Sequence, residues 1–106
     1  MVTRQQIEQW AVRIGRLFAP EKVVLFGSYA YGKPDRSSDV DLLVIMNHTA
    51  TAIQKASEIR LALPDDMPID VIVRTPHALQ ARLAMNDYFM RDIIEKGRVL
   101  YASGDH

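Results

Sequence analysis

The alternation of apolar and polar residues along the chain predicts helices and short strands in turn. In four segments apolar residues recur three and four positions apart, which is the spacing of one face of a helix. We expect these buried faces to include Leu17 and Ile53. The predicted helices are the segment behind a capping box at Thr3 and ended by Pro20, the segment 51–63, the segment from Pro76 to Met85, and a final helix from a cap at Asn86 to Lys96.

Runs rich in valine, isoleucine and leucine predict the strands between these helices. They are Lys22–Phe26, Asp39–Met46, Ile69–Arg74 and an edge strand at Val99–Tyr101. Tyr29–Tyr31 is expected to form a short turn or helix after the first strand. This order of elements predicts an α/β fold of the α+β type, in which helices cover a mixed β-sheet.

Composition narrows the class of protein without changing this outline. With 106 residues, 48% apolar and 25% charged, the chain has the balance of an ordinary globular protein, and we expect one domain over 1–106. Thirteen basic and thirteen acidic residues give no net charge, which argues against binding of long nucleic acid. The absence of cysteine excludes disulfides, a thiolate nucleophile and a cysteine zinc site.

No segment of the sequence has the pattern of a signal peptide or a membrane span. The N-terminus opens directly on a polar and apolar helical pattern. No apolar run approaches the roughly 20 residues that are needed to cross a bilayer. We therefore expect a cytoplasmic protein without membrane contact.

Three aspartates near the starts of two predicted strands are the first candidates for chemistry. Asp39 and Asp41 stand two apart, so their side chains point to the same side of a strand, with Cα atoms roughly 6–7 Å apart. Two such carboxylates repel each other unless a cation lies between them, and Mg²⁺ prefers carboxylate oxygens together with water and phosphates. If the strand that begins with Ile69-Asp70 is a neighbour, all three acids can converge on one pair of metal ions.

Gly27 and Ser28 supply a candidate phosphate site between the first strand and the element that follows it. A glycine at a strand end lets the backbone approach a ligand closely, and a helix start offers free N–H groups to phosphate. Ser28 adds a hydroxyl donor. A metal and triphosphate site follows, in which Asp70 is the best candidate to help remove the proton of an attacking hydroxyl.

The spacing of these residues resembles a known family. Gly27-Ser28, ten residues and Asp39-Val40-Asp41 match the Gly-Ser-x₁₀-Asp-x-Asp signature of the polymerase-β-like nucleotidyltransferase superfamily. Ile69-Asp70-Val71-Ile72 looks like the strand of that family that carries the third acid. The sequence is most similar to the minimal nucleotidyltransferases, which are the antitoxins of HEPN/MNT toxin–antitoxin pairs.

The resemblance implies an activity, two cosubstrates and a partner. It implies the polymerase-β-like nucleotidyltransferase fold, with Asp39, Asp41 and Asp70 as metal ligands and Gly27 and Ser28 at the nucleotide. It further implies that AMP from ATP is transferred, with Mg²⁺ (two ions), to a tyrosine hydroxyl of a HEPN ribonuclease toxin, in a hetero-oligomer. The last helices carry more apolar residues than one face needs, and these are expected to help in that contact: Leu83, Met85, Phe89, Met90, Ile93 and Ile94.

Other functions stay open from the residues alone. One is an antitoxin that neutralises its partner by contact with little catalysis, and another is a subunit that modifies a small molecule such as an aminoglycoside. The segment from Gly27 to Lys33 nearly spells a Walker A loop, but Pro34 stands where that loop needs a serine or threonine. We interpret Lys33, Arg36 and Arg60 as solvated side chains.

Overall fold

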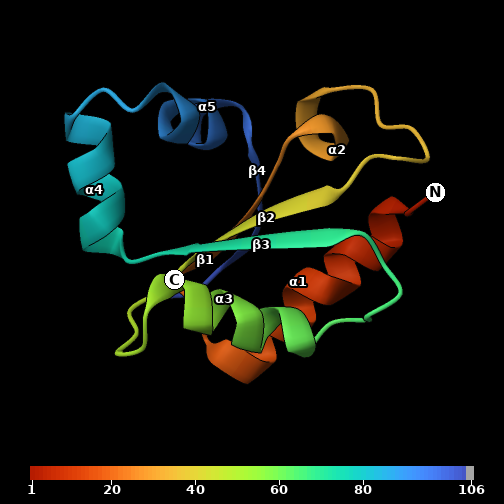
Figure 1. Ribbon diagram of the computed structural model, residues 1–106, viewed down its shortest axis with the longest axis horizontal. Helices are drawn as coiled ribbons and strands as arrows, with labels where there is room; N and C mark the ends of the chain where they lie inside the picture. Colours follow the sequence, from red (N-terminus) through yellow and green to blue (C-terminus); the bar gives the residue numbers. More distant parts are fainter. Residues whose placement is uncertain (105–106) are drawn as a thin grey trace.

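The computed structural model describes residues 1–104 of the chain (Figure 1). Along that part the elements are α1 (Arg4–Phe18), β1 (Lys22–Phe26), α2 (Ser28–Tyr31), β2 (Val40–Ile45), α3 (Ala52–Leu61), β3 (Ile69–Arg74), α4 (Pro76–Ala84), α5 (Tyr88–Lys96) and β4 (Arg98–Ala102). None of the helices in these residues is both long and apolar enough to cross a membrane.

The four strands form one sheet in the order β3-β2-β1-β4. Strand β1 is antiparallel to both β2 and β4, whereas β2 and β3 run parallel. This confirms the predicted mixed sheet, and β1 and β3 have the predicted bounds. Strand β2 is one residue shorter at each end than predicted, and β4 is one residue longer at each end.

Helices cover both faces of the sheet. Helices α1 and α3 lie on one face, α4 and α5 lie on the other, and α2 stands at the end of β1 (Figure 1). Alternate residues of β2 belong to different clusters, since Leu42 packs in the α1 and α3 layer and Leu43 packs in the α4 and α5 layer. A strand that is buried on both sides has a continuous apolar sequence, which explains the unbroken run from Leu42 to Ile45.

Two residues predicted to face the core are exposed instead. Ile53 is 80% exposed and Leu17 is 57% exposed. Ile53 precedes the fully buried Ile59 by six residues along α3. Because each residue turns the helix by about 100°, the two side chains point about 120° apart round the helix axis. Leu17 falls at the margin of the buried stripe of α1, which contains Ile7, Trp10, Ala11 and Ile14.

The predicted cap of α5 is wrong by one residue. Asp87 is the N-cap, because its Oδ1 accepts a hydrogen bond of 3.1 Å from the backbone N–H of Met90. Asn86 has a φ of 58°, the left-handed conformation that asparagine tolerates better than most residues. It therefore turns the chain between α4 and α5 instead of capping the second helix.

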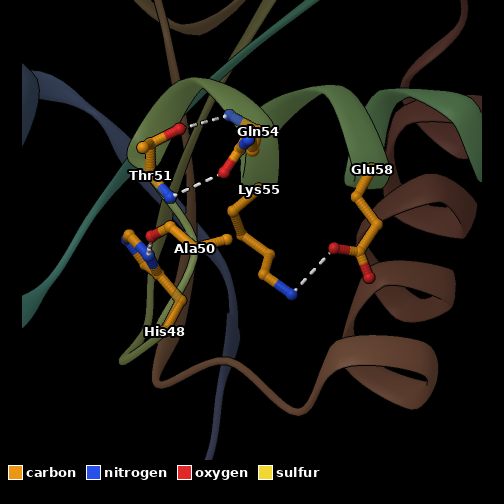
Figure 2. Close-up of polar contacts among 6 residues, drawn as sticks. All are labelled: His48, Ala50, Thr51, Gln54, Lys55 and Glu58. Atoms are coloured by element: carbon orange, nitrogen blue, oxygen red, sulfur yellow. Dashed lines mark hydrogen bonds and ion pairs between the residues drawn. The ribbon is translucent and has the colours of Figure 1, made fainter.

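The loop between β2 and α3 is held by its own polar contacts (Figure 2). Thr51 and Gln54 form a reciprocal capping box at the start of α3, with hydrogen bonds of 3.1 and 3.2 Å. The Nδ1 atom of His48 lies 2.5 Å from the carbonyl oxygen of Ala50. This loop follows the last residue of β2, so it lies at the end of that strand opposite to Asp41.

Candidate active site

The three predicted acids come together on one face of the sheet. In the parallel pairing of β2 and β3, Asp41 lies directly beside Asp70, and Asp39 precedes the first residue of β2. Residues two positions further along these strands, Leu43 and Ile72, pack in the α4 and α5 layer. Because side chains alternate along a strand, Asp41 and Asp70 point to that same face. The strands β2 and β3 are therefore neighbours, as convergence of the three acids requires.

These carboxylates carry negative charge, and no cationic side chain in the described part of the chain pairs with them directly. Burial raises the pKa of Asp41, and the charges of Asp70 and Asp39 raise it further. Burial also raises the pKa of Asp70, followed by the charge of Asp39 and a hydrogen bond with the Asp39 carboxyl, while Arg60 acts in the opposite direction. No ion pair within residues 1–104 involves any of the three acids. A bound cation would therefore offset negative charge that the described side chains leave unpaired.

Gly27 brings the start of α2 against the Asp41 carboxylate. Its backbone angles, φ 76° and ψ −158°, lie in a region that only glycine occupies readily. A Cβ atom added at Gly27 would overlap Oδ2 of Asp41. Strand pairing contributes to this approach, because Phe26 is the cross-strand partner of Asp41. The predicted phosphate site and the predicted metal site are therefore in contact.

Ser28 is the first residue of α2, where backbone donors are available to an anion. The N–H groups of Ala30 and Tyr31 donate to the carbonyl of Gly27. Those of Ser28 and Tyr29 donate to no protein group in the part of the chain that the structure describes. Two backbone donors and the Ser28 hydroxyl thus directly follow Gly27, which lies against Asp41, as a triphosphate site requires.

Arg60 of α3 is a residue of this site that the sequence interpretation missed. Its guanidinium donates hydrogen bonds of 2.8–2.9 Å to the carbonyl oxygens of Pro64, Met67 and Ile69. These carbonyls belong to the turn before β3 and to the residue before Asp70, so Arg60 fixes the entry of the strand that carries the third acid. It is not a freely solvated side chain. Its partners are backbone atoms, and a sequence pattern does not reveal them.

Comparison with known proteins identifies the family. Residues 7–101 match the family described as "Nucleotidyltransferase domain". The chain belongs to this family. The matched range contains the Gly-Ser pair and all three acids, so the geometry described above is that of a nucleotidyltransferase domain.

Two proteins of Methanocaldococcus jannaschii, each named "putative protein adenylyltransferase", are similar in sequence. One is 32% identical over 81 residues, which cover 76% of this chain and 78% of that protein. The other is 36% identical over 53 residues, which cover 50% of this chain and 54% of that protein. The chain therefore spans only about half the length of the second relative.

Solved structures share the fold at lower identity. A "putative nucleotidyltransferase" from Sulfolobus solfataricus superposes with a TM-score of 0.64 at 16% identity, over 93% of this chain and 79% of that one. A toxin–antitoxin structure with AMP-PNP gives 0.59 at 22% identity, over 92% and 74% of the two chains. A mutant of the toxin–antitoxin MntA-HpeT gives 0.58 at 20% identity over the same shares. The nucleotidyltransferase fold is thereby confirmed.

In this nucleotidyltransferase domain, hydrogen bonds between its own residues hold the loop before Asp39 in place. Oδ1 of Asp35 accepts hydrogen bonds from the backbone N–H and hydroxyl of Ser37, at 2.8 and 2.7 Å. The Ser38 hydroxyl in turn accepts from the backbone N–H of Asp35, at 2.9 Å. The bonds that the carboxylate accepts, led by that of the Ser37 hydroxyl, lower the pKa of Asp35. The sequence signal for this role is an aspartate two residues before a serine, which is typical of an Asx turn.

The donor set fits Mg²⁺, although the acids alone do not complete a site. Within residues 1–104 no three acidic, histidine or cysteine side chains are arranged to hold a metal ion. Mg²⁺ needs fewer protein ligands, since it is commonly bound by one or two carboxylates with phosphate and water filling the other positions. Asp39 and Asp41, with Gly27 beside Asp41, match that requirement. The assignment of Asp39, Asp41 and Asp70 as metal ligands stays a prediction.

A large groove lies on the opposite face of the sheet from the acids. An open groove of about 1040 Å³ runs between α1 and the end of α3, and Trp10, Arg13 and Leu61 are among its lining residues. It contains none of the three acids, and α1 and α3 cover the other face of the sheet (Figure 1). We place the site at the acids because three carboxylates meet there, whereas the residues that line the groove include one acid, Glu8.

Proposed function

We propose that this nucleotidyltransferase domain transfers AMP from ATP, with Mg²⁺, to a tyrosine hydroxyl of a HEPN-domain ribonuclease toxin, and so acts as its antitoxin. One observation supports the transfer of AMP from ATP with Mg²⁺. The Gly27 backbone, next to the free donors of Ser28, is held against the carboxylate of Asp41. Triphosphate and metal are therefore expected at a single point, beside a third acid on the neighbouring strand.

In this proposal each residue has a distinct task. Gly27 and Ser28 hold the β- and γ-phosphates, while Asp39 and Asp41 hold the metal ions, with Asp70 on the acceptor side. Bound Mg²⁺, expected as two ions, supplies the positive charge that offsets the phosphates and the acids. The acceptor oxygen bonds to the α-phosphorus, the bond to the bridging oxygen of the β-phosphate breaks, and pyrophosphate leaves. Asp70 takes the hydroxyl proton, a role that suits a carboxylate with a raised pKa.

A protein acceptor is supported by the relatives. The two sequence relatives are named as protein adenylyltransferases, and two structures that share the fold are toxin–antitoxin assemblies, one of them with an ATP analogue. We carry these properties over to the present chain as part of the proposal. The acceptor protein would then form a hetero-oligomer with it, in the cytoplasm, where ATP and Mg²⁺ are abundant.

The test is transfer of label from α-labelled ATP. The purified protein is incubated with Mg²⁺, α-labelled ATP and lysate of the source cells, and labelled proteins are separated and identified by mass spectrometry. We expect one labelled protein whose modification is lost in the Asp39→Ala/Asp41→Ala double variant. The matched control is Asp65→Ala/Asp66→Ala, which removes two exposed acids from the turn before β3 and should keep full activity.

The outcome also separates the alternatives. A labelled band that persists in the Asp39→Ala/Asp41→Ala variant would contradict the metal assignment. No band with folded protein, in lysate shown to contain the toxin, would overturn protein adenylylation. Protection of cells by that double variant would then establish an antitoxin that acts by contact.

A further inference from the structure

Phe89 of α5 places an exposed aromatic ring at the edge of the candidate active site. Its ring centroid lies 5.8 Å from that of Phe26, and the two rings are nearly perpendicular, at 86°. Phe26 is the cross-strand partner of Asp41 and immediately precedes Gly27. Phe89 therefore stands beside the residues to which we assign the triphosphate.

The packing of α5 shows that this ring is held but not covered. Met90 and Ile93, on the same helix, are fully buried, whereas Phe89 remains 54% exposed. The edge contact with Phe26 restricts the orientation of the ring, in a geometry that aromatic pairs favour. A single exposed apolar residue is ordinary on a protein surface. An oriented, half-exposed ring next to a phosphate-binding glycine is a more specific feature.

The order of residues across the sheet indicates which ligand meets this ring. Strand pairing places Asp70, Asp41 and Phe26 side by side in one row. In an in-line transfer the attacking oxygen and the leaving pyrophosphate lie on opposite sides of the α-phosphorus. The acceptor then lies on the Asp70 side of the row, and the pyrophosphate lies on the side of Phe26 and Gly27. The nucleoside is attached to the same phosphorus across this axis, on the α4 and α5 side of the sheet to which Asp41 points.

We propose that the exposed face of Phe89 stacks on the nucleobase of the bound nucleoside triphosphate. The inference rests on the proposed function, since it takes the phosphates to lie at Gly27 and Ser28. A base presents a flat π-face, and stacking on an aromatic side chain contributes affinity without requiring hydrogen bonds to the base. Phe89 would thus bind the nucleoside half of ATP, while Gly27 and Ser28 bind the phosphate half.

Calorimetric titration of two ligands tests this division. A non-hydrolysable ATP analogue carries base and phosphates, whereas inorganic tripolyphosphate carries the phosphates alone, and each is titrated with Mg²⁺. For Phe89→Ala we expect about tenfold weaker binding of the analogue and unchanged binding of tripolyphosphate. Phe89→Trp, which keeps a flat ring, should bind the analogue at least as well as wild type. The matched control is Tyr88→Ala, because Tyr88 is an adjacent aromatic residue that is 80% exposed.

Other results of the titrations would contradict either the stacking of Phe89 on the base or the proposed function. Unchanged binding of the analogue by Phe89→Ala, or equal losses for both ligands, would overturn base stacking and leave the proposed function in place. Equal losses of the analogue in Tyr88→Ala and Phe89→Ala would also contradict the specific role of Phe89. If wild type binds neither ligand, the proposed function fails, and the stacking proposal with it. Phe89→Leu keeps the apolar contact with Phe26 and replaces Phe89→Ala should the latter not fold.

Discussion

Gly27 is under two separate constraints, and both predict that even alanine is harmful there. The first is its backbone conformation, with φ at 76°, and the second is the close approach of the Asp41 carboxylate. We expect Gly27→Ala to lower the free energy of unfolding by about 1–3 kcal/mol, the usual range for a residue in such a strained conformation. Chemical denaturation by urea measures the loss.

A double-mutant cycle separates the two constraints. In an Asp41→Ala background the added Cβ meets no carboxylate, so only the backbone strain is left. We expect Gly27→Ala to cost less in that background than in wild type. Equal costs in the two backgrounds would show that the contact between Gly27 and Asp41 has no energetic weight.

The raised pKa of Asp41 predicts a stability that depends on pH in a defined direction. Burial and the charges of Asp70 and Asp39 raise this pKa, so the folded protein holds the proton more tightly than the unfolded chain does. Ionised Asp41 therefore destabilises the fold, a cost that is absent below the unfolded pKa of about 3.9 and grows as pH rises through the folded pKa. Without metal, Asp41→Asn should stabilise the protein by about 0.5–1 kcal/mol at pH 7, a typical cost of adjacent like charges.

Urea unfolding of wild type and Asp41→Asn with EDTA, at pH 7 and pH 4, checks this direction. Asp35 and Asp87, whose pKa values are lowered by hydrogen bonds in the folded state, have the opposite effect on the pH dependence of stability. Because both proteins contain these two residues, their effect cancels in the difference between the unfolding free energies of wild type and Asp41→Asn. We expect the advantage of Asp41→Asn to shrink toward pH 4. An advantage of the same size at both values would show that ionisation of Asp41 is not its cause.

Helix α3 and strand β3 are connected by a turn whose geometry depends on Arg60. Three backbone carbonyls of this connection accept from one guanidinium, and the last belongs to Ile69, directly before Asp70. Arg60→Lys keeps the charge but cannot reproduce the planar fork of donors. We expect this variant to lose about 1–3 kcal/mol of stability through unpaired carbonyls and to transfer AMP more slowly, because Asp70 is less well placed.

The readout for Arg60 must distinguish positioning from general damage. Melting curves give the stability, and kcat and KM for ATP are measured at a temperature where both proteins are folded. A positioning role predicts a fall in kcat with little change in KM for ATP. Arg91→Lys is the matched control, since among residues 1–104 Arg91 pairs only with the exposed side chain of Asn86. A kcat for Arg60→Lys equal to that of Arg91→Lys would limit Arg60 to a structural role.

The local elements were largely predictable, because each has a signal in its own residues. The capping boxes at Thr3 and Thr51 and the apolar runs of β1 and β3 mark their boundaries directly. Errors occurred where neighbouring elements decide the outcome. Ile53 is exposed because the sheet contacts a different side of α3, and β2 begins after Asp39, where pairing with Ile69 of β3 begins.

The residues of the candidate site were predictable where they lie close together in the sequence. Positions and roles that depend on the path of the chain were not. Gly27, Ser28, Asp39 and Asp41 form a spacing pattern that is visible in one stretch of sequence. The position of Asp70 beside Asp41 required the strand order, and the role of Arg60 required the path of the turn. Among the apolar residues expected to contact a partner, Met90 and Ile93 are fully buried, so the surface left for such a contact includes Met85 and Ile94.

The arrangement of the site across the fold predicts how its ligands should stabilise the protein. Gly27 and Ser28 follow β1, Asp39 and Asp41 lie at the start of β2, and Asp70 lies in β3, so Mg²⁺ and triphosphate together would link three separate segments. A ligand that binds only the folded state at 100 times its Kd adds about 2.7 kcal/mol of stability. For a domain of this size we expect a rise in Tm of about 10–20 °C with Mg²⁺ and a non-hydrolysable ATP analogue.

Removal of the metal should abolish most of that rise, because the phosphates then face three carboxylates whose charge no bound cation offsets. Melting curves with the analogue in Mg²⁺ and in EDTA measure the difference, and Asp39→Ala/Asp41→Ala should show little rise in either. The Asp65→Ala/Asp66→Ala control should melt as wild type does, since those two acids lie in an exposed turn. An equal rise in EDTA would mean that the backbone donors of Ser28 and Tyr29 hold the triphosphate without metal, and the carboxylates would then need another role.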